Sequence, residues 1–180
     1  SEVEEVERRV DEVLKELKRK VDRSREESER IARELERLVE ESEKKVRDVV
    51  RELEDLLRKV DREEVKKLVK EIIDELKRSS DRVRELVRRL IKEAEDSSDE
   101  VRRRIEDLLE RLKELVEKAA REGRGEDLKE KIKEVEDRVD KVIKENKDLL
   151  DDVERRVRKV IKENEDLIKE LRKRVEEVAR

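Results

Sequence analysis

The sequence predicts an all-α fold, an antiparallel (up-down-up) bundle of three long and nearly straight helices. Two observations lead to this prediction. Apolar residues return every 18 residues along the chain, and only two short segments interrupt this repeat. The chain also lacks proline and aromatic residues, has only two glycines, and is 61% charged. A charged composition with a helical period is typical of long helices rather than of sheets.

The repeat is clearest in residues 141–149, which return with one difference as residues 159–167. The same period places Val65, Val83 and Val101 in one phase. Because this period is about five turns at ~3.6 residues per turn, the apolar stripe runs parallel to the axis of an undistorted helix. A seven-residue repeat would instead impose a left-handed supercoil. We therefore expect untwisted helices.

The first helix is predicted over about residues 2–59. Val3, Val6, Val10, Val13 and Leu17 fall within one arc of ~100 to 120° at 100° per residue, the width of a face that packs on a core. The remaining arc is almost entirely Glu, Lys, Arg and Asp. The sequence therefore offers one buried face and no second one.

The second helix is predicted over about residues 62–121, after a loop near residues 60–61. The apolar phase shifts there, and Asp61 is followed three residues later by Glu64, which is the spacing of a capping box. An alternative interpretation cuts this helix at residues 78–81 and 96–99, where Ser and Asp could cap new helices. The phase of the valine repeat persists across both segments and favours the unbroken helix.

The third helix is predicted over about residues 126–180, after a loop near residues 122–125. Gly123 and Gly125, the two glycines of the chain, suit a helix C-terminal cap and a turn. The three helices have matched lengths of roughly 80 to 90 Å at ~1.5 Å per residue. We expect residues 1–180 to form a single domain that closes on itself as a monomer.

Nine polar residues occupy phases where the repeat calls for apolar ones. We expect a residue of the first helix to lie level with the residue of the second helix whose number, added to its own, gives 121. We expect it to lie level with the residue of the third helix whose number is larger by 122. With these two relations the nine residues group into two layers. The first polar layer is Ser24, Ser28, Ser97, Ser98 and Asn146, and the second polar layer is Ser42, Ser79, Ser80 and Asn164. Asn and Ser side chains both donate and accept hydrogen bonds, so we expect each layer to form an interhelical network. Two alternatives stay open: hydroxyl groups that bond the carbonyl one turn back in their own helix, and a ligand site.

These features together resemble parametrically designed helical bundles with buried hydrogen-bond networks, a class made by computation. The resemblance covers all 180 residues and rests on the straight-helix repeat, the charged surface, the glycine loop and the paired polar layers. It implies that the networks set which helices pair and in what register, because a shifted register would bury unpaired polar groups.

The composition excludes most chemistry. Without His or Cys, no serine has an activating base, and the carboxylates are interleaved with Lys and Arg on the solvent arc. The basic run at residues 102–104 is followed by acidic residues and has no aromatic neighbour, and no glycine-rich phosphate loop exists. No apolar run approaches the ~18 residues of a membrane span. We expect no enzymatic activity, catalytic residue, cofactor, metal, nucleic acid, membrane or small-molecule partner.

The sequence thus predicts a designed structural scaffold without a natural biochemical function, soluble and cytoplasmic in a recombinant host. The alternative function is a designed interaction protein, either a homo-oligomer or a component of a helix-displacement switch.

Overall fold

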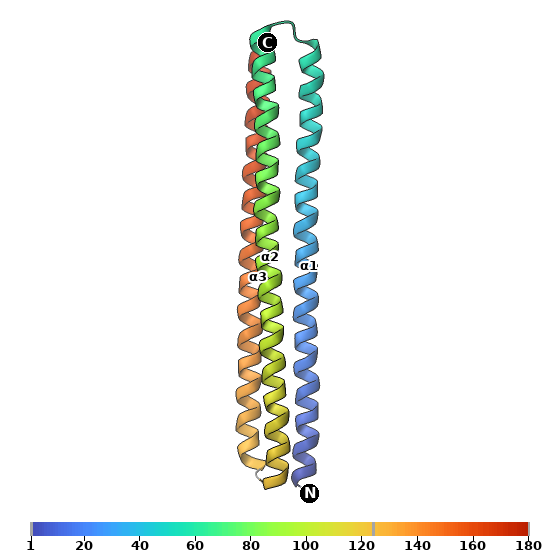
Figure 1. Ribbon diagram of the computed structural model, residues 1–180, viewed down its shortest axis with the longest axis vertical. Coiled ribbons are helices and arrows are strands. Elements are labelled where there is room, and N and C mark those ends of the chain that lie inside the picture. The colour runs from blue at the N-terminus through green and yellow to red at the C-terminus, as the bar shows by residue number, and fades with distance from the viewer. Residues whose placement is uncertain (1, 124, 180) are drawn as a thin grey trace. The chain divides into compact units, whose positions relative to one another are not determined.

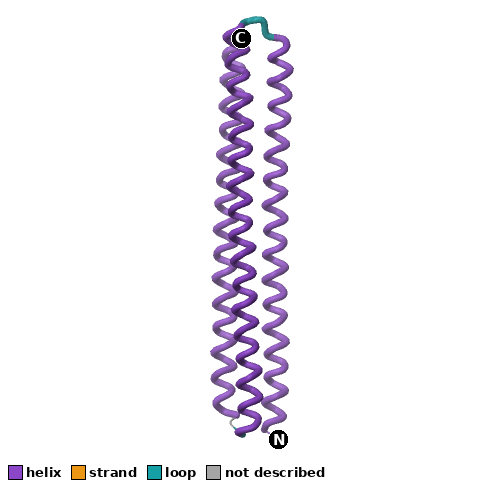
Figure 2. The backbone as a smooth tube through the Cα atoms, viewed as in Figure 1, coloured by secondary structure: helices purple, strands orange, loops and turns teal. Residues whose placement is uncertain are grey.

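The computed structural model describes residues 2–123 and 125–179, with the side chains of residues 2, 3 and 126 left out. These residues form three helices, α1 (Glu2–Lys59), α2 (Glu63–Glu122) and α3 (Gly125–Ala179) (Figure 1). The described chain contains no strand, and the segments outside the helices are short (Figure 2). The predicted three-helix bundle is confirmed, and each helix begins and ends within one residue of its expected position.

The loop between α1 and α2 shows a difference from the predicted capping box. The amide of Val60 donates to the Leu56 carbonyl at 3.1 Å, which closes the last turn of α1, and the amide of Lys66 donates to the Arg62 carbonyl at 3.0 Å. Arg62 therefore directly precedes α2, whereas the expected capping residue, Asp61, lies one position further back. The helix starts where its backbone hydrogen bonds start, and Glu63 and Glu64 place negative charge in its first turn, which the helix dipole favours.

The loop between α2 and α3 follows the glycine prediction closely. Gly123 immediately follows the last residue of α2 and has a φ of 69°, the left-handed conformation that ends many helices. No described non-glycine residue has a positive φ. Gly125 is the first residue of α3, one position before the expected start.

The alternative that cuts the second helix is wrong. α2 runs without a break through residues 78–81 and 96–99. Ser79, Ser80, Ser97 and Ser98 are half-buried within this helix, so they are interior residues of α2 rather than caps of new helices.

The contacts within the chain define two compact units, each built from a segment of every helix. Unit 1 comprises Ser1–Ile31 and Glu93–Asp151, and unit 2 comprises Ala32–Lys92 and Asp152–Arg180. Within unit 2, α1 and α3 run parallel, because the ion pairs Glu34–Arg158, Lys45–Glu165 and Glu52–Arg172 advance in the same direction along both helices. The three-residue loop after α1 turns the chain back, so α2 runs opposite to α1 in this unit (Figure 1).

Each unit has its own aliphatic core, formed by the predicted stripes. In unit 1, Leu17 of α1, Leu112 of α2 and Val139 of α3 are at most 1% exposed and belong to one cluster. In unit 2, Val69 and Leu171 are similarly buried in a second cluster. Because a fully buried Leu, Ile or Val side chain contributes ~1.5 to 3 kcal/mol, these two clusters are the main source of stability within their units.

Candidate functional site

The nine polar residues of the two layers lie in or beside these cores. Three of them are fully buried polar residues: Ser42, Asn146 and Asn164 are 3%, 2% and 4% exposed. The other six serines are half-buried. All residues of the first polar layer belong to unit 1, and all residues of the second belong to unit 2. Each layer is therefore a feature of one unit.

The second polar layer joins all three helices through hydrogen bonds. The Ser79 hydroxyl of α2 donates to Asn164 Oδ1 of α3 at 2.6 Å, and Asn164 Nδ2 donates to the Ser42 hydroxyl of α1 at 3.4 Å. Asn164 thus uses both its acceptor and its donor, one toward each neighbouring helix. Ser80 is half-buried and makes no hydrogen bond to the other residues of this layer in the described structure.

The first polar layer is arranged differently. Asn146 Nδ2 of α3 donates to the Ser28 hydroxyl of α1 at 3.4 Å, and that hydroxyl donates to the Ser24 carbonyl at 2.9 Å. The second of these bonds is the local alternative, a hydroxyl bonded one turn back in its own helix. Among the described residues, Asn146 Oδ1 is buried without a hydrogen-bond partner, and neither Ser97 nor Ser98 bonds to it. Both arrangements considered from the sequence therefore occur in this layer.

The chemistry available to these layers is neutral hydrogen bonding. Amides and hydroxyls carry no charge at ordinary pH, and a buried polar group is far less costly when it is bonded than when it is not. Such a group discriminates between arrangements of its neighbours, because only some arrangements bring its partners within reach. The layers can therefore specify how helices pair.

A charged pair that the sequence reasoning missed lies near the second layer. Arg84 Nε of α2 donates to Glu43 Oε1 of α1 at 2.5 Å, and the Glu43 side chain is only 17% exposed. The hydrogen bond from Arg84 lowers the pKa of Glu43, with burial acting in the opposite direction and with smaller lowering contributions from the charges of Arg84, Arg47 and Arg88. The same bond raises the pKa of Arg84.

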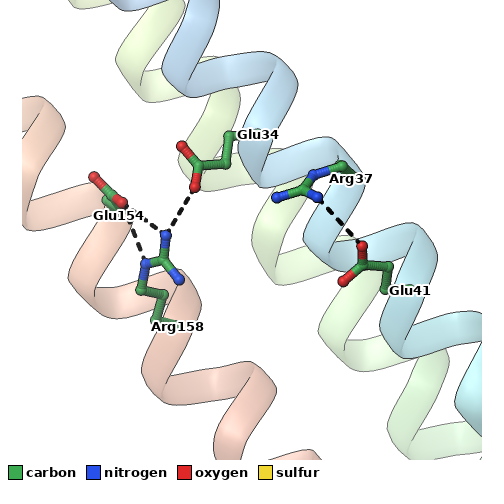
Figure 3. A network of polar contacts seen from close by, with 5 residues as sticks. All are labelled: Glu34, Arg37, Glu41, Glu154 and Arg158. Atoms are coloured by element: carbon green, nitrogen blue, oxygen red, sulfur yellow. Dashed lines mark hydrogen bonds and ion pairs between the residues drawn. The ribbon is translucent and has the colours of Figure 1, made fainter.

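Ion pairs between α1 and α3 were also missed. In unit 2, Arg158 is bonded to Glu154 on its own helix and to Glu34 of α1, whereas Arg37 and Glu41 pair within α1 (Figure 3). The hydrogen bond to Glu154 is the largest of the effects that raise the pKa of Arg158. This bridge connects α3 to α1 through half-exposed side chains.

Three further pairs between α1 and α3 share one spacing, 120 residues: Lys20–Asp140 in unit 1, and Lys45–Glu165 and Glu52–Arg172 in unit 2. The hydrogen bond to Glu165 raises the pKa of Lys45. The signal was available in the sequence, because the predicted offset of 122 places residues 120 apart nearly level, and these positions carry opposite charges.

Two hollows lie in unit 1. The larger, of about 390 Å³, is lined by α2 and α3 and includes the exposed basic residues Arg104, Arg111, Arg138 and Lys141 together with the acidic residues Asp107 and Glu145. The smaller, of about 40 Å³, lies at the α2–α3 loop and is lined mainly by Val6, Val116, Ala119, Ala120 and Leu128 with both glycines. The larger hollow therefore mixes both signs of charge, and the smaller one is mainly apolar, with Glu7 as its one charged lining residue.

None of the helices in residues 2–123 and 125–179 combines the length and the apolar character that crossing a membrane requires. No group of three or more acidic side chains in that part of the chain is placed to hold a metal ion. Comparison of the sequence with protein-family models and with curated proteins, and of the fold with solved structures, found no match.

Proposed function

We propose that this chain is a designed structural scaffold, a monomer in which buried polar groups specify how three helices pair. The 18-residue repeat, the uniform charged surface and the chemistry of the Ser/Asn layers support a structural role. The proposal assigns the chain no catalytic activity, cofactor or ligand.

The observation that carries this proposal is the pair of bonds made by Asn164. This side chain is 4% exposed, and it bonds Ser79 of α2 and Ser42 of α1. A displacement of α2 by one turn would place an aliphatic side chain where Ser79 lies, since Leu76 and Val83 occupy the adjacent buried positions of α2. Because an unsatisfied buried polar group costs ~1 to 3 kcal/mol, the layer penalises shifted pairings.

Replacing the whole second layer with apolar residues of the same phase tests the proposal. The quadruple variant Ser42→Val, Ser79→Leu, Ser80→Val and Asn164→Leu should unfold at equal or higher denaturant concentration, as apolar replacement of a buried polar cluster often does. It should also lose specificity for one pairing of the helices. Light scattering would detect this loss as association, and disulfide trapping between introduced cysteines would detect it as alternative registers. A variant that is less stable and keeps one register would contradict the proposal.

A designed interaction protein is a second candidate, and one observation favours it. The first polar layer bonds α1 to α3 and leaves Asn146 Oδ1 without a partner in the described structure, so this layer adds no hydrogen bond to the apolar packing of α2 in unit 1. A helix held in this way is a suitable element for displacement by another helix. Light scattering and mixing with a labelled copy separate the two candidates. A chain that is monomeric at every concentration and does not exchange helices with the labelled copy supports the scaffold.

A further inference from the structure

The two polar layers contain matched residues because of the 18-residue repeat. Each of four positions in the first layer lies one repeat from its counterpart in the second: Ser24 from Ser42, Ser97 from Ser79, Ser98 from Ser80, and Asn146 from Asn164. Equal sequence would suggest equal bonding. The hydrogen bonds show that the two layers are not equivalent.

The difference lies in the helix that each asparagine engages. Asn164 accepts a bond from Ser79, whereas Asn146 Oδ1, in a residue that is 2% exposed, accepts none in the described structure. On the donor side, Asn164 reaches the matched serine, Ser42, but Asn146 reaches Ser28, which lies one turn beyond the matched Ser24.

The hydroxyl of Ser28 explains why the first layer remains incomplete. It donates its single hydrogen to the Ser24 carbonyl, so toward Asn146 it can act only as an acceptor. The carbonyl oxygen of Asn146 therefore depends on another donor, and α2 supplies none among the described residues. A buried acceptor without a donor is a cost to the folded state.

We infer that Asn164 determines the pairing of α2 and that Asn146 does not, although the sequence presents them as equivalents. The inference rests on the proposed role of the polar layers in helix pairing and assigns that role to one layer. It also identifies position 97 as the place where a stronger donor from α2 would complete the first layer.

Two matched double-mutant cycles in the full chain test this inference by denaturant unfolding. One cycle combines Ser79→Ala with Asn164→Leu, and the other combines Ser97→Ala with Asn146→Leu. The first pair should be coupled by about fivefold in the unfolding equilibrium constant, the effect of a hydrogen bond worth ~1 kcal/mol. The second pair should be additive.

Every result of the two cycles is informative. Equal coupling in both layers, or coupling in the first layer alone, would overturn the inference and leave the proposed role of polar layers intact. Coupling in neither layer would overturn both the inference and that role. Coupling confined to Ser79 and Asn164 supports both.

A gain of stability provides a second readout that does not depend on removing groups. Asn offers two N–H donors and a longer reach than Ser, so Ser97→Asn should shift the unfolding midpoint to higher denaturant. The matched control Ser79→Asn disturbs an existing 2.6 Å bond and should shift the midpoint to lower denaturant. If Ser97→Asn destabilises as much as Ser79→Asn, the inference fails.

Discussion

Ser79 and Asn164 join α2 to α3 through a 2.6 Å hydrogen bond between buried aliphatic neighbours: Leu76 and Val83 on one helix, Ile161 and Ile168 on the other. A short bond in such surroundings is sensitive to a change in the charge of either partner, because the interior solvates charge poorly. This relationship leads to the first prediction.

Asn164→Asp should make the stability of the protein depend strongly on pH. The introduced carboxyl group has nearly the shape of the amide, but its ionised form cannot donate to Ser42 and would be a buried charge, at a cost of ~3 to 5 kcal/mol. Burial raises the pKa of this group in the folded state, so stability is lost as pH rises through that pKa and is regained on acidification toward the unfolded value.

Urea unfolding of Asn164→Asp and of the parent between pH 4 and 8 measures this effect. Asn164→Leu is the control, since it removes the same bonds without introducing a titrating group. A stability difference between Asn164→Asp and the parent that does not vary with pH would show that position 164 is accessible to water.

The Glu43–Arg84 pair predicts a loss of stability in acid. Because the pKa of Glu43 is lowered from its ordinary value of 4.5, the pair stabilises the fold fully above that value. The contribution is lost as pH falls through the lower, folded-state pKa. Since Arg84 is 43% exposed, solvent screens the pair and we expect its contribution to stability to be small. Glu43→Gln should flatten this part of the pH–stability curve, while Glu41→Gln, at a more exposed pair, should leave it unchanged.

The two glycines should respond oppositely to substitution by alanine. Gly123 has a φ of 69°, which a side chain disfavours, so Gly123→Ala should destabilise. At Gly125 a Cβ would meet Val6 Cγ2 at 3.5 Å, an ordinary contact beside the small apolar hollow. Gly125→Ala should stabilise by ~0.4 to 1 kcal/mol through the entropy of the unfolded chain. Thermal unfolding of both variants decides the matter, and a shift of the same sign in both would contradict the assigned conformations.

Two leucines of α2 in unit 2 should differ greatly in their sensitivity to truncation. Leu76 is 1% exposed within the aliphatic cluster, and Leu76→Ala should cost ~2 to 5 kcal/mol. Leu86 is 38% exposed, and Leu86→Ala should change stability by no more than ~0.5 kcal/mol. A large effect at Leu86 in chemical denaturation would reveal a contact that covers this side chain in solution.

High salt should change stability little. The α1–α3 pairs of unit 2 have side chains that are 30% to 60% exposed, and exposed pairs are individually worth ~0 to 1 kcal/mol and are screened by salt. Far-ultraviolet circular dichroism at low salt and at 1 M salt should show the same helicity. Extensive loss of helix would mean that the charges, rather than the buried aliphatic residues, hold the fold together.

The fold could be predicted from the sequence because the apolar repeat and the loop residues point to the same answer. Helix bounds followed from the phase shift after Val60 and from Gly123, which each mark a change in backbone direction. The start of α2 was placed slightly early, since capping-box spacing at Asp61 does not decide which carbonyl accepts the first helical bond.

The hydrogen-bond partners of the polar residues could not be predicted in the same way. Phase and offset bring Ser42 and Asn164 level, and these two residues do bond. The same arithmetic brings Ser24 and Asn146 level, yet Asn146 bonds Ser28. A serine one turn away is an equally good acceptor, and the choice depends on side-chain rotamers that periodicity does not encode.

The charges of the α1–α3 ion pairs in unit 2 have a consequence for how these two helices align. A helix whose pattern repeats every 18 residues presents nearly the same apolar face after a displacement of one repeat, and such a displacement brings Asn146 to the level of Asn164. The charges at the α3 positions that pair with α1 in unit 2 do not repeat. Moving α3 by one repeat would replace the partners of Glu34, Lys45 and Glu52 with Asp140, Lys147 and Glu154, so that all three attractions become repulsions. These pairs add little to the stability of the observed alignment, but they disfavour the alignment that is shifted by one repeat. The surface charges thus distinguish two alignments in which the apolar contacts are nearly the same.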